Sequence, residues 1–376
     1  MITKIKQNLS FYLNSRKDWS TKEKIVVIES DDWGSLRMPN AQAYNNLHNS
    51  GMSVDKCAFM KYDSLETAQD FEALQNTFNG IYTKTGKKPV ITANYIMANP
   101  DFNKIKESNF RTYFRTYFWD YLNEKKLLEE YKSMLIKIMD NGFFYPQLHG
   151  MEHLNVSYWM DFLRNGSAET LLAFDQNVYG VSTNVATEKR ATFLAELDYA
   201  SQEEFINFIE PSLKEAAERF EDFFGYKSKS FIAPNYIWSE EVERILSDME
   251  VKFIQSSRMQ QLPKNYNGIM LRRNTASENK FGQSYLVRNC IFEPSTTLHK
   301  QEHTDRCFQQ ISNAFLWNKP AIISSHRLNY MGGIVEQNRT ENLQLLEDLL
   351  LKVAKRWPQV QFINSVELGE KILKNK

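Results

Sequence analysis

Two acidic residues and two histidines stand where side chains from distant parts of the chain could hold one metal ion. Asp31 and Asp32 follow the apolar run KIVVIES, and His149 follows FFYPQL, with His153 four residues later. Histidines four residues apart lie on one face of a helical turn, close enough to share an ion. Two imidazoles and one carboxylate leave coordination positions open, as catalytic sites require. We therefore expect Asp32, His149 and His153 to bind a divalent metal, with Zn²⁺ first and other first-row ions as alternatives.

A metal in such a site lowers the pKa of bound water towards about 7 and polarises a carbonyl. Asp31 could then act as the base. Adjacent side chains on a continuing strand point to opposite faces, so the two aspartates need a break in the strand. Gly34 follows two residues later and favours a turn. The alternative to a metal site is that the two aspartates cap the junction between strand and loop, and that the two histidines face solvent.

His326 ends the apolar run AIISS on the far side of the expected site. A histidine there could protonate a leaving amine or alkoxide, which is the general-acid half of a hydrolysis. The alternative is a core histidine with its hydrogen bonds satisfied. Trp33 and Trp238 follow other strand-end residues and could form a platform for a sugar ring, or belong to the core.

The elements that must position these residues alternate between short apolar runs and longer segments of helical periodicity. Strands alternating with helices favour a parallel sheet in an α/β fold, and this number of strands favours a barrel. We expect one domain over residues 1–376, with a helical insertion at about 154–200 and a β-rich excursion at about 268–295. The expected strands are 24–30, 89–93, 143–148, 230–233, 251–254, 321–324 and 360–363, and the clearest helices are 66–78, 121–140, 202–224, 240–248, 305–317 and 340–356.

Several of the expected strands end in polar residues. In parallel α/β barrels the carboxyl ends of the strands form one rim, which is where active sites lie. The strand-end residues therefore converge although they are far apart in sequence. They are Asp31-Asp32, Asn94, His149, Pro234-Asn235 and His326.

Composition narrows the class of protein. The chain has 376 residues, 42% of them hydrophobic, and equal numbers (46 each) of basic and acidic residues. The balanced charge gives no reason to expect nucleic acid or an anionic membrane as a partner. The N-terminus has no apolar core typical of a secretion signal, and no run approaches the roughly 20 apolar residues of a membrane span. We therefore expect a cytoplasmic protein. The three cysteines are too few and too scattered for a disulfide framework.

These residues resemble the motifs of the polysaccharide deacetylase family, the NodB-homology or carbohydrate esterase group. Asp31-Asp32-Trp33-Gly34 is similar to the family's Asp-Asp-Gly element, with an inserted Trp. His149 and His153 have the spacing of its two-histidine motif, and His326 resembles the histidine of its last motif. The resemblance implies a distorted barrel of seven strands, Asp31 as base, Asp32 as metal ligand and His326 as a catalytic residue. It also implies that the backbone N–H of Asn235 stabilises an oxyanion.

The sequence departs from the family pattern at two points. Ile232 stands where the family has an arginine that steadies the base, so another arginine must replace it or Asp31 is tuned differently. Arg37, Arg288 and Arg327 are the candidates. No copy of the family's fourth motif, which contains Asp and Trp, is found.

The function expected from the sequence is a metal-dependent hydrolase that removes acyl groups, mainly acetyl, from an amino sugar or glycan. One alternative is a barrel that has lost catalysis and serves as a glycan-binding or scaffold protein, which the replaced arginine favours. A second alternative is a metal-dependent hydrolase of a non-sugar amide.

Overall fold

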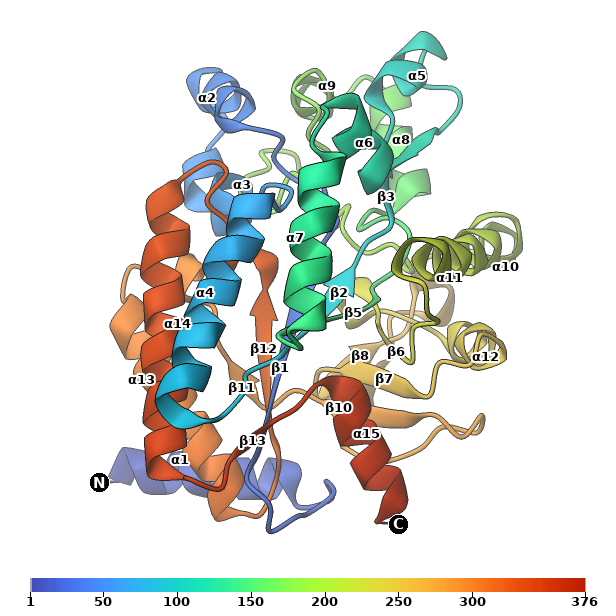
Figure 1. Cartoon of the computed structure of the whole chain (residues 1–376). Helices are drawn as coiled ribbons and strands as arrows, with labels where there is room; N and C mark the ends of the chain where they lie inside the picture. The colour runs from blue at the N-terminus through green and yellow to red at the C-terminus, as the bar shows by residue number, and fades with distance from the viewer. Residues whose placement is uncertain (1, 376) are drawn as a thin grey trace.

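The computed structural model describes residues 2–375 and has an open, curved parallel sheet, a half-barrel, at its centre (Figure 1). Eight strands follow the order β10-β7-β6-β5-β2-β1-β12-β11, and β13 pairs with the start of β1. Every pairing within this sheet is parallel. The bounds are β1 (Ile25–Trp33), β2 (Ile91–Tyr95), β5 (Phe144–Leu148), β6 (Ser230–Ile232), β7 (Phe253–Ser256), β10 (Ser284–Val287), β11 (Cys290–Ile291), β12 (Ala321–His326) and β13 (Gln361–Phe362).

The central strand β1 shows why these runs form a buried sheet. All nine of its residues are buried, and its first four are β-branched and apolar. Parallel strands covered on both faces require such continuous apolar runs. Its register against β12 places Asp31 directly beside His326. The sheet therefore sets two of the expected site residues side by side at its carboxyl edge.

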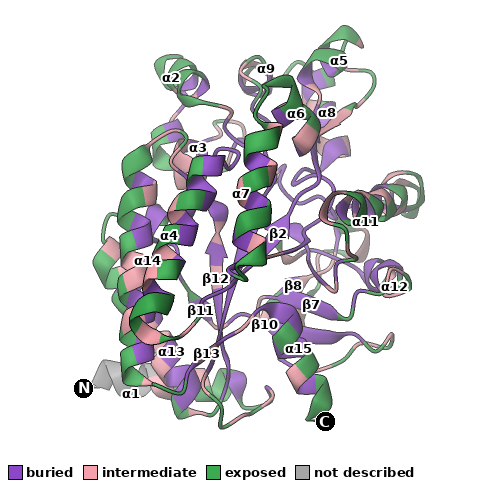
Figure 2. Cartoon of the chain, in the orientation of Figure 1, coloured by how far each residue is buried: buried purple, intermediate pink, exposed green. Residues whose placement is uncertain are grey.

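Helices cover the outside of the half-barrel, and Figure 2 shows buried residues on their inner faces and exposed residues on their outer faces. Helices α4, α7 and α14 lie side by side along one flank, where α4 contacts both of the others. The bounds are α1 (Ile2–Ser15), α2 (Ala41–Asn49), α3 (Ala58–Tyr62), α4 (Ala68–Thr85), α5 (Phe102–Glu107), α6 (Phe118–Glu124), α7 (Leu128–Asp140), α8 (Val156–Arg164), α9 (Ala168–Phe174), α10 (Gln202–Glu204), α11 (Glu210–Phe224), α12 (Glu240–Asp248), α13 (Lys300–Leu316), α14 (Glu336–Arg356) and α15 (Ser365–Lys374).

The expected excursion at 268–295 is partly wrong, because two of its segments belong to the main sheet. β10 pairs with β7 and β11 pairs with β12, so they form the two edges of the half-barrel. The sequence SYLV of β10 is a buried strand, with all four residues buried. Outside the main sheet are two antiparallel pairs, β3 (Ala98–Pro100) with β4 (Arg115–Tyr117) and β8 (Met259–Gln261) with β9 (Met270–Arg272).

The expected helical insertion at 154–200 is helical only in its first half. It contains α8 and α9, and residues 175–200 then run without a regular helix or strand. Side chains of the insertion pack into two apolar clusters apart from the main core, one of them shared with residues 38–60. Among residues 2–375, no helix is both long and apolar enough to cross a membrane.

Candidate metal centre

The carboxyl ends of β1 and β5 bring Asp32, His149 and His153 together. Asp32 Oδ1 lies 3.4 Å from His149 Nε2 and 3.3 Å from His153 Nε2. One potential ligand atom from each residue lies within 4.8 Å of the other two. All three residues are buried. The convergence expected from the sequence is therefore present in the fold.

The chemistry of these atoms fits a divalent cation. Asp32 Oδ1 and His149 Nε2 are buried and have no hydrogen-bond partner. Leaving a buried polar atom unsatisfied costs about 1–3 kcal/mol, so such atoms in a folded protein need an explanation. His149 Nδ1 donates to the carbonyl of Ile232 at 2.8 Å, which leaves the lone pair on Nε2. Burial lowers the pKa of His153 to about 3, so its imidazole is neutral and also able to bind a metal.

A break in β1 aims both aspartates into the site. The pairing of β1 with β2 shifts register between Ser30 and Trp33, as in a β-bulge. Asp32 within this bulge has φ of 74°, a left-handed conformation that is uncommon for a residue other than glycine. The expected turn at Gly34 is therefore preceded by a bulge at Asp31–Asp32 itself.

Asp31 is held as a carboxylate by Arg288. The guanidinium donates to both carboxylate oxygens, each at 2.6 Å, and Asn94 Nδ2 donates to Oδ1 at 2.7 Å. Burial opposes ionisation, but the charge of Arg288 outweighs it and lowers the pKa of Asp31 to about 2. A second buried acid, Glu29, accepts from Arg288 Nε at 2.7 Å.

Of the three arginines considered from the sequence, Arg288 is the one that contacts Asp31. It lies in the two-residue link between β10 and β11, whereas the family pattern places its arginine at the position of Ile232. Arg37 instead lies 3.4 Å from Asp32 Oδ2, and Arg327 pairs with Asp63 and Glu66. The departure at Ile232 therefore leaves Asp31 with a bidentate guanidinium partner.

His326 lies beside Asp31, with Nε2 at 4.0 Å from Asp31 Oδ2. Its Nδ1 is 2.5 Å from Glu293 Oε1. Burial opposes protonation of His326, but Glu293, Asp32 and Asp31 outweigh it and raise its pKa to about 9. Sequence reasoning missed Glu293, although it follows β11 and so obeys the same strand-end pattern as the other rim residues.

Asn235 occupies the loop after β6. Its φ of 56° and that of Tyr236, 57°, are both left-handed. The end of β6 and this loop contact both halves of the site, because the carbonyl of Ile232 accepts from His149 and the Tyr236 hydroxyl accepts from Arg288 at 3.1 Å. A role for the Asn235 N–H toward an oxyanion stays a prediction.

The expectation of a sugar platform at Trp33 and Trp238 is wrong. Each side chain is only 1% exposed, in the main core. Trp33 Nε1 donates to Ser30 Oγ at 3.0 Å, and Trp238 Nε1 donates to Glu243 Oε1 at 2.9 Å. Neither ring has a free face on which a sugar could stack, because both rings are buried among residues of the main core.

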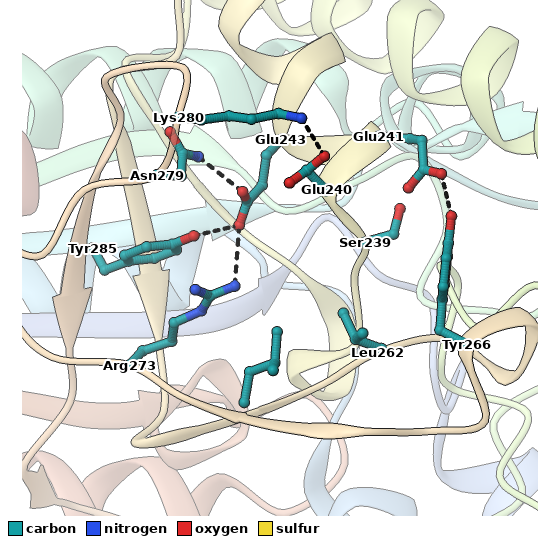
Figure 3. Close-up of a pocket in the computed structure, with 11 residues that line it drawn as sticks. Ser239, Glu240, Glu241, Glu243, Leu262, Tyr266, Arg273, Asn279, Lys280 and Tyr285 are labelled. Atoms are coloured by element: carbon teal, nitrogen blue, oxygen red, sulfur yellow. Dashed lines mark hydrogen bonds and ion pairs between the residues drawn. The ribbon is translucent and has the colours of Figure 1, made fainter.

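Glu243, the partner of Trp238, lines a second hollow of about 440 Å³ between α12 and the strands β9 and β10 (Figure 3). Its central acid is Glu243, which is 3% exposed. Tyr285 and Asn279 donate to Glu243 at 2.5 and 3.0 Å, and Arg273 lies 3.5 Å away. This carboxylate is fully satisfied by protein groups.

Comparison with known proteins gives structural matches only. No family model and no curated protein sequence matches the chain. A putative polysaccharide deacetylase from Mycobacterium smegmatis matches at 10% identity and TM-score 0.41, over 95% of this chain and 93% of that one. A probable polysaccharide deacetylase from Pseudomonas aeruginosa matches at 10% identity and TM-score 0.44, over 93% and 91%. A CE4 family pseudoenzyme from Bacillus anthracis matches at 12% identity and TM-score 0.37, over 92% and 66%.

These three matches are distant, with identities of 12% or less. At these identities we take the function from the side chains of the site, not from the matched proteins.

Proposed function

We propose that the protein is a metal-dependent hydrolase that removes acyl groups, mainly acetyl, from an amino sugar or glycan. The observation that carries the proposal is the group of three buried donors, Asp32, His149 and His153, around atoms with no protein partner. An ionised carboxylate and a protonated imidazole stand next to this group, as acyl transfer to water requires.

Asp32, His149 and His153 would hold the metal, and Zn²⁺ suits these donors. When bound, a metal ion supplies polarisation of the acyl carbonyl and a lowered pKa for water. Asp31 accepts the proton of the attacking water. Arg288 and Asn94 together occupy both lone pairs of its Oδ1 but only one of its Oδ2, so Oδ2 is the accepting atom.

His326 acts on the other side of the scissile bond. Its pKa of about 9 keeps the ring protonated at neutral pH, so Nε2 can donate a proton to the leaving amine or alkoxide. Glu293 holds Nδ1 and stabilises the charged ring. The Asn235 N–H donates to the oxyanion of the tetrahedral intermediate.

The alternative of an inactive, glycan-binding protein drew on the missing arginine. Arg288 supplies a guanidinium to Asp31, and this favours the enzyme. A panel of acetylated sugars and small amides separates the carbohydrate substrate from the second alternative, a non-sugar amide. The cytoplasmic location expected from the sequence stays a prediction, which fractionation of the native host tests.

The deciding experiment is metal analysis of purified wild type beside His149→Ala, with acetate release measured on the same samples. We expect about one metal ion per wild-type chain, and loss of both metal and acetate release in the variant. Equal stoichiometric metal in the two proteins would overturn the proposal.

A further inference from the structure

We propose that Glu196 is a positioning residue for the two histidines, and that its carboxylate sets the affinity of the site for a divalent cation. It acts on the backbone of the loop 150–152, which joins His149 to His153. The inference rests on the metal site of the proposed function and assigns a role to the insertion at 154–200.

Glu196 makes direct contacts to every residue of this loop. Its Oε1 accepts from the backbone N–H of Met151 at 2.9 Å and of Glu152 at 3.3 Å. Its Oε2 packs against Gly150, where an added Cβ would lie 2.0 Å from that oxygen. Gly150 has φ of 115°, a conformation that side chains rarely adopt. The carboxylate is 3% exposed, so solvent does not compete for these bonds.

The opposite side of the loop is held by the backbone of β2 and β3. His149 N–H donates to the carbonyl of Tyr95 at 2.8 Å, and Ala98 N–H donates to the carbonyl of Met151 at 2.7 Å. The two clamps are complementary, because the sheet side binds the carbonyl of Met151 and Glu196 binds its N–H. Without Glu196, the peptide between the two histidines is held from the sheet side only.

Glu152, between the histidines, points away from them. Its Oε1 lies 2.8 Å from Arg115 Nε and accepts from the Tyr113 hydroxyl at 3.1 Å. The side chain therefore ties the loop to β4 and leaves the orientation of the imidazoles to the backbone. Glu196 is the acid that contacts this backbone.

Burial and the nearby Glu152 raise the pKa of Glu196 well above its usual value, so its contacts to the loop act as buried hydrogen bonds and do not depend on a charge. Loss of an outer partner of this kind costs about 10- to 100-fold in metal affinity. The mechanism is geometric. His149 Nε2 and His153 Nε2 must stay within reach of one ion, and their separation is fixed by the loop that Glu196 holds.

The test measures Zn²⁺ affinity by competition with a chromophoric chelator for Glu196→Ala, Glu196→Asp and Glu196→Gln. We expect about 10- to 100-fold weaker binding for the alanine and aspartate variants. The glutamine variant should bind within about threefold of wild type, because its carbonyl oxygen still accepts both N–H bonds. A change in charge alone would weaken Zn²⁺ binding in the glutamine variant and spare the aspartate variant. We expect the opposite order of Zn²⁺ affinities.

Glu188→Ala is the matched control, since Glu188 belongs to the same insertion and accepts from Ser167 at 2.8 Å. Its Zn²⁺ affinity should equal that of wild type, and urea unfolding of the chelated proteins reports any general loss of fold. Equal affinity of Glu196→Ala, Glu196→Asp and wild type would overturn the role of Glu196 alone. Absence of Zn²⁺ binding by wild type would overturn the metal site and this inference together.

Discussion

Asp32 and Glu243 are both buried acids at the ends of regular elements, yet their surroundings differ in kind. Glu243 in α12 accepts hydrogen bonds from Tyr285 and Asn279 (Figure 3) and from Trp238, and its carboxylate needs no further partner. Asp32 Oδ1 has no hydrogen-bond partner and lies 3.4 and 3.3 Å from the Nε2 atoms of His149 and His153. A buried polar group that the protein leaves unsatisfied marks a place for something else, whereas a satisfied one marks structure.

The backbone conformations of Asp32 and Glu243 also differ. Asp32 lies in a bulge with a left-handed φ, a conformation that costs about 1–3 kcal/mol and persists only where the surroundings enforce it. Glu243 lies in a regular helix that begins with the Ser239 cap. Strain and unsatisfied atoms thus coincide at the first site and are absent from the second.

The sharpest test of this contrast changes Asp32. In Asp32→Asn the carboxylate is replaced by an amide of nearly the same shape that is a poor ligand. We expect metal binding to weaken by at least about 100-fold and acetate release to fall with it. Wild type should gain about 2.7 kcal/mol of unfolding free energy at a Zn²⁺ concentration 100 times its Kd, and the variant at most about 0.4 kcal/mol. Urea unfolding with and without Zn²⁺ measures this, and an equal gain in both would erase the contrast.

Asp31→Asn separates catalysis from metal binding within the same site. The variant should keep stoichiometric metal, because Asp31 is not among the three donors. Its kcat for acetate release should fall by about 10²- to 10⁴-fold, the usual contribution of a general base. Acetate release by both proteins at the same uncatalysed rate would instead support an inactive, glycan-binding protein.

Glu243→Gln is the reciprocal change in the second hollow. One amide oxygen can replace one carboxylate oxygen, but the amide N–H₂ then faces donors, so at least one buried donor loses its acceptor. We expect a loss of about 1–3 kcal/mol of unfolding free energy, read from the urea midpoint. Metal content and kcat should stay within about twofold of wild type, within the additivity expected of distant sites. A loss of metal in this variant would show that the two regions are not independent.

Glu293→Gln gives the smallest effect and probes the electrostatics of His326. A general acid must be protonated, so activity should persist up to the His326 pKa of about 9 and fall above it. Removing the Glu293 charge lowers that pKa, and the alkaline limb of kcat should move to lower pH by about 1–3 units. The rate below pH 6 should change little, because the ring is still protonated there. An unmoved alkaline limb would remove His326 from the role of acid.

Much of the fold could be predicted from periodicity alone. The seven expected strands all overlap observed strands, because each is an apolar run of the kind that a parallel sheet buries. β10 was placed outside the barrel, since its neighbours in sequence, the β8–β9 hairpin and the loop 273–283, are polar and irregular. The long helix expected at 121–140 is two helices, α6 and α7, separated at Lys125–Leu127, where Lys126 has φ of 60°.

The site was predictable where a residue sits at a strand end and unpredictable where it depends on three-dimensional pairing. Asp32, His149 and His153 converge as their positions predict. Which of Arg37, Arg288 and Arg327 contacts Asp31 depends on how distant strands are arranged in space. The sequence carries no signal for that arrangement. Trp33 and Trp238 failed as a platform because following a reactive residue says nothing about the direction of a ring.

The link between β10 and β11 has a consequence for how such chains are sorted. A linear pattern that demands arginine at the end of β6 finds Ile232 there and would place this chain among those that lack the arginine. Yet Arg288, in the link between β10 and β11, supplies a guanidinium to Asp31. A guanidinium can therefore reach one position in space from different strands, and a search by linear pattern misses that.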